Sequence, residues 1–187
     1  MTDTTVTTTA LPLVPGTWTL DAAHTAVAFS IKRIGWAKVR GLFTDVAAEL
    51  VVGETLAETS LTATIALASV DTGNADRDAH LRSPDIIDVA VRPTLAYRST
   101  SITGEGEDWT VEGELTIGDV TRPHTLDVTF AGASVFPPDG RLHAGFEART
   151  EVRRKDFGLG FGAMGAGMGA AAKVDIDIEL VGPEDAV

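Results

Sequence analysis

The sequence predicts an all-β fold of about eight antiparallel strands in a single domain. Runs in which apolar and polar residues alternate recur along most of the chain, and this pattern is typical of strands with one buried face. Glycine, proline and aspartate cluster between these runs, where the chain has to turn. The 187 residues, 44% of them hydrophobic, suffice for one large core. Periodicity alone leaves a closed barrel and a two-sheet sandwich as alternatives, because either one buries the apolar face.

The first strands are expected before residue 53. A short opening strand lies around Trp18, and the run at residues 25–33 places Val, Phe and Ile on one face. The apolar run at residues 39–52 changes phase by one residue near Thr44 and Asp45. A phase change of this kind predicts a bulge or bend, which helps a sheet to curl.

The remaining strands follow the same two-residue period. They are expected at residues 61–67, 95–97, 109–117, 126–130, 142–148 and 174–180. Turn residues separate strands at Gly53-Glu54, residues 103–108, Gly118-Asp119 and residues 138–140. Connections this short favour antiparallel neighbours.

A short helical insertion is expected around residues 74–90. Asn74 can cap a helix whose first turn carries Asp76 and Asp78. The Ser-Pro-Asp sequence at residues 83–85 has the residue types that begin a second helical turn. Such an insertion could cover one end of a barrel.

The domain is expected to span residues 16–182, with a disordered, Thr-rich tail at residues 1–15 and a C-terminal tail at residues 183–187. The first residues carry Asp3 and no Lys or Arg, so they do not resemble a secretory signal. No apolar run reaches the roughly 20 residues that cross a bilayer as a helix. A soluble, cytoplasmic protein is therefore expected.

The charge balance argues against two classes of partner. The chain has 15 Lys and Arg against 27 Asp and Glu, which gives a formal net charge of -12. An acidic surface repels phosphate backbones and anionic lipid headgroups at long range. Neither nucleic-acid binding nor stable membrane insertion is expected, and the absence of Cys excludes disulfides and thiolate metal sites.

No motif indicates catalysis, a metal or a cofactor. His24, His80, His124 and His143 lack the spacing of zinc-binding motifs. Residues 160–165 match the glycine spacing of dinucleotide-binding loops, but strand-like alternation follows where that fold needs a helix. The apolar strand faces contain no His, Asp or Glu, and no serine lies in a GxSxG elbow. We therefore expect no catalytic residue, no bound metal and no cofactor other than a lipid ligand.

Residues 18–43, 69–99, 113–128 and 153–159 carry a set of motifs, of which the pattern RDxHLxSxDxxD starting at Arg77 is the most specific. Together they resemble the YceI-like family of polyisoprenoid-binding proteins. The resemblance implies a lipocalin-like, eight-stranded antiparallel β-barrel, which favours the barrel over the sandwich. It also implies that a polyisoprenoid or similar long-chain lipid occupies an apolar tunnel. Many family members carry an export signal that is absent here, and the family often has His at the position of Arg33.

Two hypotheses assign residues to the ligand. The first takes the apolar phase of each strand as the tunnel lining: Phe29, Ile31, Phe43, Ile65, Leu67, Leu95, Tyr97, Trp109, Val111, Phe130 and Phe146. The second places the headgroup at a rim of donors: His24, Arg33, Arg77, His80 and Arg154. A structural network that ties the helical insertion to the barrel is an equal alternative for the rim.

The expected function is non-enzymatic binding, sequestration or transport of an isoprenoid-type lipid, such as a polyprenyl phosphate or a quinone precursor. One alternative is an isomerase or hydrolase that acts on a small apolar substrate inside the same barrel. Another is a stress-related interaction module whose barrel is fully packed. A homodimer is compatible with the sequence, which does not fix the oligomeric state.

Overall fold

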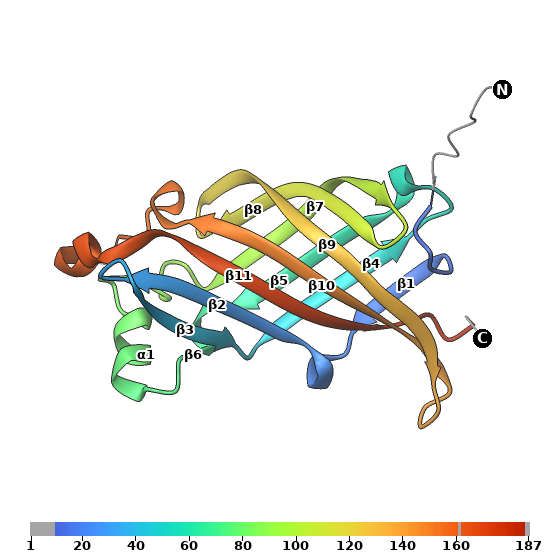
Figure 1. Ribbon diagram of the computed structural model, residues 1–187, viewed down its shortest axis with the longest axis horizontal. Helices are drawn as coiled ribbons and strands as arrows, with labels where there is room; N and C mark the ends of the chain where they lie inside the picture. Colours follow the sequence, from blue (N-terminus) through green and yellow to red (C-terminus); the bar gives the residue numbers. More distant parts are fainter. Residues whose placement is uncertain (1–9, 161, 186–187) are drawn as a thin grey trace.

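The computed structural model of the protein describes residues 10–160 and 162–185. Their strands form one antiparallel sheet that closes into a barrel (Figure 1). The closed ring has eight strands, in the order β1 (Gly16–Leu20), β4 (Val46–Val52), β5 (Ser60–Ala66), β7 (Thr94–Glu105), β8 (Asp108–Ile117), β9 (Val120–Phe136), β10 (Arg141–Arg153) and β11 (Met168–Val181), and β11 pairs again with β1. The predicted eight-stranded barrel is confirmed.

Three further strands, β2 (Ala26–Arg33), β3 (Ala37–Phe43) and β6 (Val70–Asp71), extend the barrel at one end. One edge of β11 pairs with β1 near the chain end and with β2 along the rest of its length. The predicted bend at Thr44 and Asp45 is confirmed as the break between β3 and β4. Because of this break, β3 pairs with β2 and β6, whereas β4 pairs with β1 and β5.

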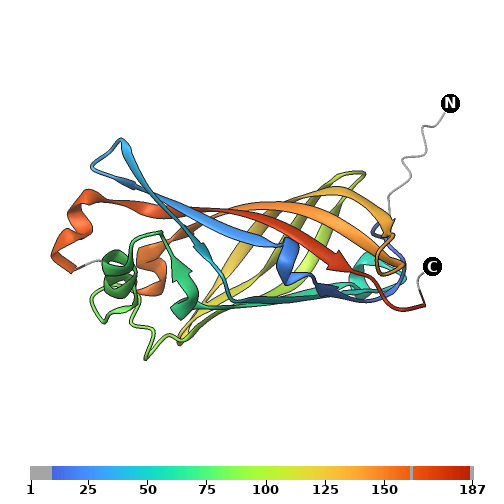
Figure 2. The same cartoon turned by 90° about the horizontal axis from the view of Figure 1, so that it is seen from below.

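The helical insertion lies at the same end of the barrel as the β2–β3 hairpin (Figure 2). It contains the helix α1 (Ala75–Arg82), and the Asn74 side chain accepts a hydrogen bond from the Arg77 amide at 2.9 Å, as the cap motif predicts. The second helical turn expected at residues 83–85 is a series of turns instead. The reason is that the Ser83 hydroxyl donates to the His80 carbonyl at 2.7 Å, which closes α1 rather than capping a new helix.

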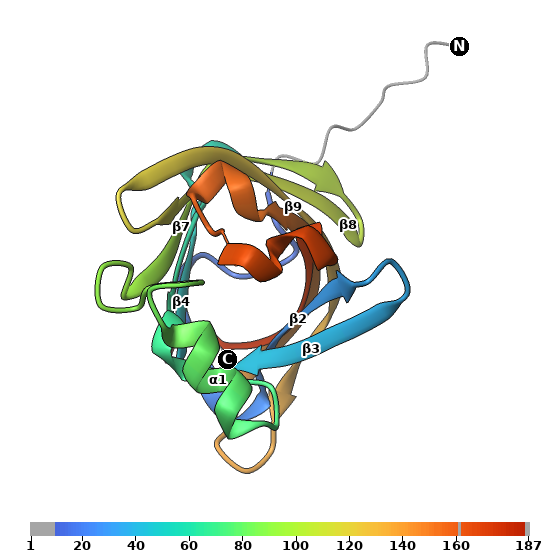
Figure 3. The same cartoon turned by 90° about the vertical axis from the view of Figure 1, so that its left-hand side faces the viewer.

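Short 3₁₀ helices connect several strands: η1 (Ala22–His24), η2 (Leu56–Glu58), η3 (Leu67–Ser69), η4 (Arg154–Phe157) and η5 (Gly162–Gly167). η4 and η5 lie at the α1 end, which Figure 3 shows face on. The described ends of the chain lie at the opposite end of the barrel (Figure 1). The two ends therefore differ: one is built from helices and a hairpin, and the other from the first and last segments of the chain.

Of the tail expected at residues 1–15, residues 1–9 lie outside the described residues. Within residues 10–15, Leu11 and Leu13 pack against the core. Leu11 is buried, and the Trp18 indole donates to the Val14 carbonyl at 3.0 Å. The packed part of the chain thus begins before residue 16, because this segment contributes apolar side chains to the core.

β7 and β9 are longer than alternation predicts. β9 extends well beyond the expected residues 126–130 at both ends. Ladder pairing with β8 and β10 continues through positions where Thr, Ser, Gly and Ala interrupt the apolar pattern. Backbone pairing with neighbouring strands therefore sets their length, which a pattern of side chains does not report.

Candidate functional site

The barrel encloses two adjoining cavities with mainly apolar walls. The outer cavity has a volume of about 470 Å³ and the inner cavity about 140 Å³. Leu95, Val152 and Val174 line both, so these three side chains lie at the boundary where the cavities adjoin. A slim, elongated molecule could occupy both cavities at once.

The inner cavity lies toward the end of the barrel where the described chain ends meet. Leu11 lines it, so the segment before β1 helps to close this end. Ile102, Trp109 and Leu180 also contribute, and each is at least nine-tenths buried. Apart from His124, Thr150 and the Tyr97 hydroxyl, the side chains lining this cavity are aliphatic or aromatic.

The outer cavity lies beneath α1. Leu81, Ile86 and Ile87 of the insertion cover it from one side, and side chains of β2, β3 and β11 form the opposite wall. Exposed polar residues also line it, among them Asp76 and Arg77. The outer cavity therefore reaches the surface at the α1 end, while its deeper part is apolar.

Ten of the eleven residues assigned to the tunnel line one of these cavities. Ile65, Leu95, Tyr97, Trp109, Val111 and Phe146 line the inner one, and Phe29, Ile31, Phe43, Leu67 and again Leu95 line the outer one. Phe130 lines neither cavity; its ring packs against Phe146 with centroids 5.4 Å apart. The two-residue period thus identifies the inward face of the strands, although their role in binding stays a prediction.

Arg154 is the buried member of the predicted rim, with 6% of its surface exposed. Its guanidinium donates to the carbonyls of Gly160, Gly165 and Gly169 at 2.7, 2.9 and 2.8 Å. Gly160 and Gly165 belong to the segment that resembles a dinucleotide-binding loop in sequence, and Gly169 follows it. These hydrogen bonds tie the backbone of this glycine-rich region to Arg154 at the α1 end of the barrel, so this side chain holds a loop in place.

Arg77 also makes structural hydrogen bonds. Its guanidinium donates to the Thr72 hydroxyl at 2.7 Å and to the Thr72 carbonyl at 2.8 Å. The same hydroxyl donates to the buried carboxylate of Asp78 at 2.5 Å. These contacts join α1 to Thr72, the residue that follows β6, so Arg77 makes local structural hydrogen bonds in this structure.

Of the other three predicted rim residues, two line the outer cavity and one lies outside it. His80 and Arg33 both line the outer cavity and are exposed; the His80 imidazole lies 3.6 Å from the Asp85 carboxylate. Arg33 makes no side-chain hydrogen bond to another described residue. His24 lies in η1, bonded to Asp21 at 3.0 Å, and lines neither cavity. The structure therefore brings together four of the five rim residues and leaves His24 apart.

The inner cavity contains a polar pair that the sequence reasoning missed. His124 and Thr150 line it, and the Thr150 hydroxyl lies 2.8 Å from His124 Nε2 and 2.8 Å from the Thr125 carbonyl. Because the hydroxyl donates to this carbonyl, it accepts from Nε2, which places the imidazole proton there. The expectation that the inward faces contain no His is wrong at this position.

A signal for His124 was present in the alternation. It lies in phase with Leu126 and Val128, two residues before the first residue of the apolar run.

Burial lowers the pKa of His124, so the neutral form is favoured at physiological pH. Burial likewise raises the pKa of Tyr97 to about 12, and its hydroxyl donates to the Val111 carbonyl at 3.0 Å. Among the described residues, no Asp or Glu lines the inner cavity to complete an acid–base pair with the imidazole.

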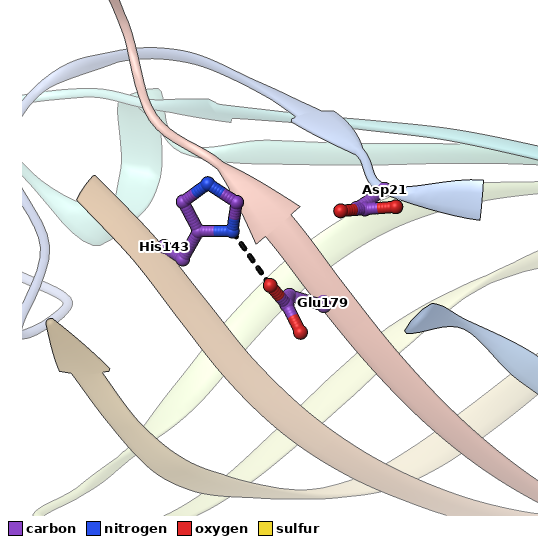
Figure 4. Close-up of side chains that lie close together, drawn as sticks. All are labelled: Asp21, His143 and Glu179. Atoms are coloured by element: carbon purple, nitrogen blue, oxygen red, sulfur yellow. Dashed lines mark hydrogen bonds and ion pairs between the residues drawn. The ribbon is translucent and has the colours of Figure 1, made fainter. Parts of the chain in front are cut away.

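A separate polar cluster lies near the described chain ends (Figure 4). Asp21, His143 and Glu179 each place one potential metal-ligand atom within 4.8 Å of the others. The nitrogens of the buried imidazole face carboxylates: Nδ1 is 2.6 Å from Glu179 and Nε2 is 2.9 Å from Asp139. Burial alone would lower the pKa of His143, but these two hydrogen bonds and the carboxylate charges raise it. The carboxylates of Glu179 and Asp139 therefore hold the His143 imidazole in place through hydrogen bonds and favour its protonated form.

Comparison with known proteins gives a consistent result. A family model described as a YceI-like domain matches residues 18–181. Protein YceI of Escherichia coli O17:K52:H18 is 36% identical over 140 residues, which cover 74% of this chain and 73% of the relative.

Solved structures agree on the fold. Burkholderia cenocepacia BcnA matches with a TM-score of 0.76 at 21% identity, over 86% of this chain and 98% of the other. A polyisoprenoid-binding domain from Saccharophagus degradans, implicated in plant cell wall breakdown, matches with a TM-score of 0.62 at 16% identity. That match covers 89% of this chain and 98% of the other.

In the described part of the chain, no helix is both long and apolar enough to traverse a bilayer.

Proposed function

Since the chain belongs to the YceI-like family and its barrel encloses two joined apolar cavities, we propose that it binds a long-chain, isoprenoid-type lipid without catalysing a reaction. The observation that carries the proposal is that the two cavities adjoin at Leu95, Val152 and Val174, which belong to both linings. A long chain that passes between these side chains would occupy both cavities as one elongated apolar site. The family relation and the lipid named for the Saccharophagus degradans domain support the same ligand class.

The shape and polarity of the site favour a lipid with its tail inside. The apolar inner cavity is the deep end, and the polar residues of the outer cavity lie where it reaches the surface. Each methylene-sized group taken out of water contributes about 0.8 kcal/mol, so ten such groups contribute about 8 kcal/mol before ordering costs. Apolar contact alone can therefore supply tight binding.

Arg33 is the rim residue best suited to contact a phosphate headgroup. Arg77 and Arg154 already donate to protein acceptors, whereas Arg33 is exposed at the cavity mouth without such an acceptor among the described residues. A guanidinium can bind phosphate through two parallel hydrogen bonds. A polyprenyl phosphate would then place its charge at Arg33 and its chain in the cavities. A protein that releases the lipid at this mouth would deliver it, and one that retains the lipid would sequester it.

The enzyme alternative has less support. His124 and Thr150 form the polar pair of the inner cavity, but catalysis by an imidazole base needs a partner that donates or stabilises charge. The packed-barrel alternative conflicts with the two cavities. A cavity of several hundred Å³ with an apolar lining is typical of ligand sites.

The proposal is tested by a bulky substitution at the boundary between the two cavities. Delipidated protein is incubated with a long-chain polyprenol, and bound lipid is counted by native mass spectrometry. We expect Leu95→Trp to lose most of the uptake, because the indole fills the space between the cavities. Val135→Trp adds the same ring on β9, where the native side chain is 47% exposed, and should retain uptake. Equal uptake by both variants, with wild-type melting behaviour, would refute the tunnel.

A further inference from the structure

The tip of the β2–β3 hairpin presents apolar side chains to solvent. Trp36 is 80% exposed and Ile34 is 52% exposed, whereas Trp18 and Trp109 are 0% and 4% exposed. Ile34 has a φ of 51°, an unfavourable conformation for a β-branched residue. Its amide donates to the Gly167 carbonyl at 2.7 Å, so the tip is held to η5. The structure thus fixes two large apolar side chains where they contact water.

The same hairpin is strongly basic in an acidic protein. Lys32, Arg33, Lys38 and Arg40 lie on its two strands, and Lys32 is directly opposite Lys38 in the ladder. Like charges placed opposite each other destabilise a sheet. None of the four forms an ion pair with another described residue, and the sequence has no Asp or Glu at residues 22–44. The hairpin therefore carries a local patch of positive charge, although the net charge of the whole chain is -12.

The position of the hairpin relates this patch to the cavity. The hairpin projects from the barrel at the end that carries α1 and η5, as Figures 2 and 3 show. Arg33 and Val39 of the hairpin line the outer cavity, while Lys38 and Arg40 point away from it. A surface that touches the hairpin tip would also lie beside the mouth of the cavity.

We propose that the β2–β3 hairpin docks the protein on the surface of an anionic lipid bilayer. Trp36 and Ile34 enter the headgroup region. Lys32, Lys38 and Arg40, the hairpin cations that do not line the cavity, contact lipid phosphates. Tryptophan is enriched at this depth, and a basic residue near an anionic leaflet contributes about 1 kcal/mol. Acidic groups elsewhere on the barrel oppose docking only weakly, because charges farther than about 8 Å are largely screened at physiological salt.

A bilayer fits this surface better than nucleic acid or a protein partner. Apolar side chains at the tip with cations behind them match the change from acyl chain to phosphate along a bilayer normal. Nucleic acid would leave the Ile34 side chain without an apolar contact. Docking does not require a filled cavity, so it goes beyond the lipid binding proposed above.

The first test is co-flotation of delipidated protein with vesicles. We expect binding to vesicles of phosphatidylcholine with phosphatidylglycerol, little binding to phosphatidylcholine alone, and loss of binding at high salt. Trp36 is the reporter, because the other two tryptophans are buried. Its emission should shift to shorter wavelength, and acrylamide should quench it less, when anionic vesicles are added. Absence of binding to anionic vesicles would overturn the inference.

Matched variants separate the patch from overall charge. Lys38→Glu/Arg40→Glu should weaken vesicle binding by more than about fivefold for each cation removed. Arg98→Glu/Arg149→Glu makes the same charge change on exposed positions of β7 and β10 and should bind as wild type does. Equal weakening by both pairs would contradict the inference, as would preferential binding of the wild type to duplex DNA.

An apolar pair of variants isolates the tip. Trp36→Ser should weaken vesicle binding, whereas Val91→Ser, at another exposed apolar position, should not. Vesicle binding and polyprenol uptake are measured on the same samples. If the wild type takes up polyprenol but does not bind vesicles, docking is refuted and the proposed function stands. If it binds vesicles but takes up no polyprenol, the proposed function is refuted and docking stands.

Discussion

Replacing Arg154 tests whether this side chain holds the end of the barrel or binds a headgroup. Arg154→Met keeps most of the apolar stem but removes the guanidinium. Three carbonyls, those of Gly160, Gly165 and Gly169, lose a charged donor at 2.7–2.9 Å. A hydrogen bond to a charged group contributes about 1.5–3 kcal/mol, and such contacts on one side chain are not additive. We therefore expect the free energy of unfolding to fall by about 3–5 kcal/mol.

Urea denaturation followed by intrinsic fluorescence measures this loss, with Arg153→Met as the matched control. Arg153 is the exposed neighbour in the chain, and its replacement should change stability by less than about 0.5 kcal/mol. Hydrogen exchange should also show faster exchange at residues 159–169 in Arg154→Met. The reasoning would be refuted if both variants were equally stable while Arg154→Met alone lost affinity for a polyprenyl phosphate. That result would make Arg154 a headgroup ligand.

Three further predictions concern the cap and two histidines. Asn74→Ala should lower the free energy of unfolding by about 1 kcal/mol, because the Arg77 amide loses its acceptor. The pKa of His143 is raised by its carboxylates, so its stabilisation is complete below the unfolded value of about 6.5 and is lost as pH rises through the folded value. His143→Gln should remove this part of the pH dependence in urea titrations. The pKa of His124 is lowered by burial, so its stabilisation is present above about pH 6.5 and is lost as pH falls through the folded value. His124→Gln should remove that opposite dependence.

Each of these predictions has an outcome that contradicts it. An Asn74→Ala protein with unchanged stability would show that the helix does not need its cap. If the stability of His143→Gln followed the wild-type pH profile, the ion pair with Asp139 and Glu179 would not titrate as described. For His124, a greater wild-type stability at acidic pH would mean that the buried imidazole gains a proton on folding.

The sequence predicts those parts of the fold that depend on regular spacing. Alternation identifies the strands and the inward residues, and the phase change at Thr44 and Asp45 marks the bend. The cap residue Asn74 marks the start of α1. These features depend on neighbours in the chain, so local rules are sufficient for them.

Other parts of the site depend on contacts between distant segments. Arg154 is surrounded by glycine carbonyls, and no side-chain pattern reports where a backbone oxygen will point. His24 has a polar, loop-like sequence context like that of His80, but the fold places it in η1, outside the cavity that His80 lines. Leu11 belongs to a Thr-rich stretch whose composition gives no sign of a buried anchor.

The exposed tip of the β2–β3 hairpin shows a different limit. Trp36 lies in a turn, so it has no periodic neighbours that could assign it to a face. The role inferred for Trp36 depends on the exposure of its side chain and on the cations near it, and both are known only from the structure. The net charge of the whole chain points in the opposite direction, because it averages over this patch.

The central claim is that the joined cavities hold a long apolar lipid. Native mass spectrometry of freshly purified protein, followed by organic extraction and identification of the released molecule, tests it most directly. The account predicts a mass increment near one lipid per chain that disappears on extraction, with an isoprenoid-type chain in the extract. A bare protein mass, together with no uptake of added polyprenol by the folded protein, would contradict it.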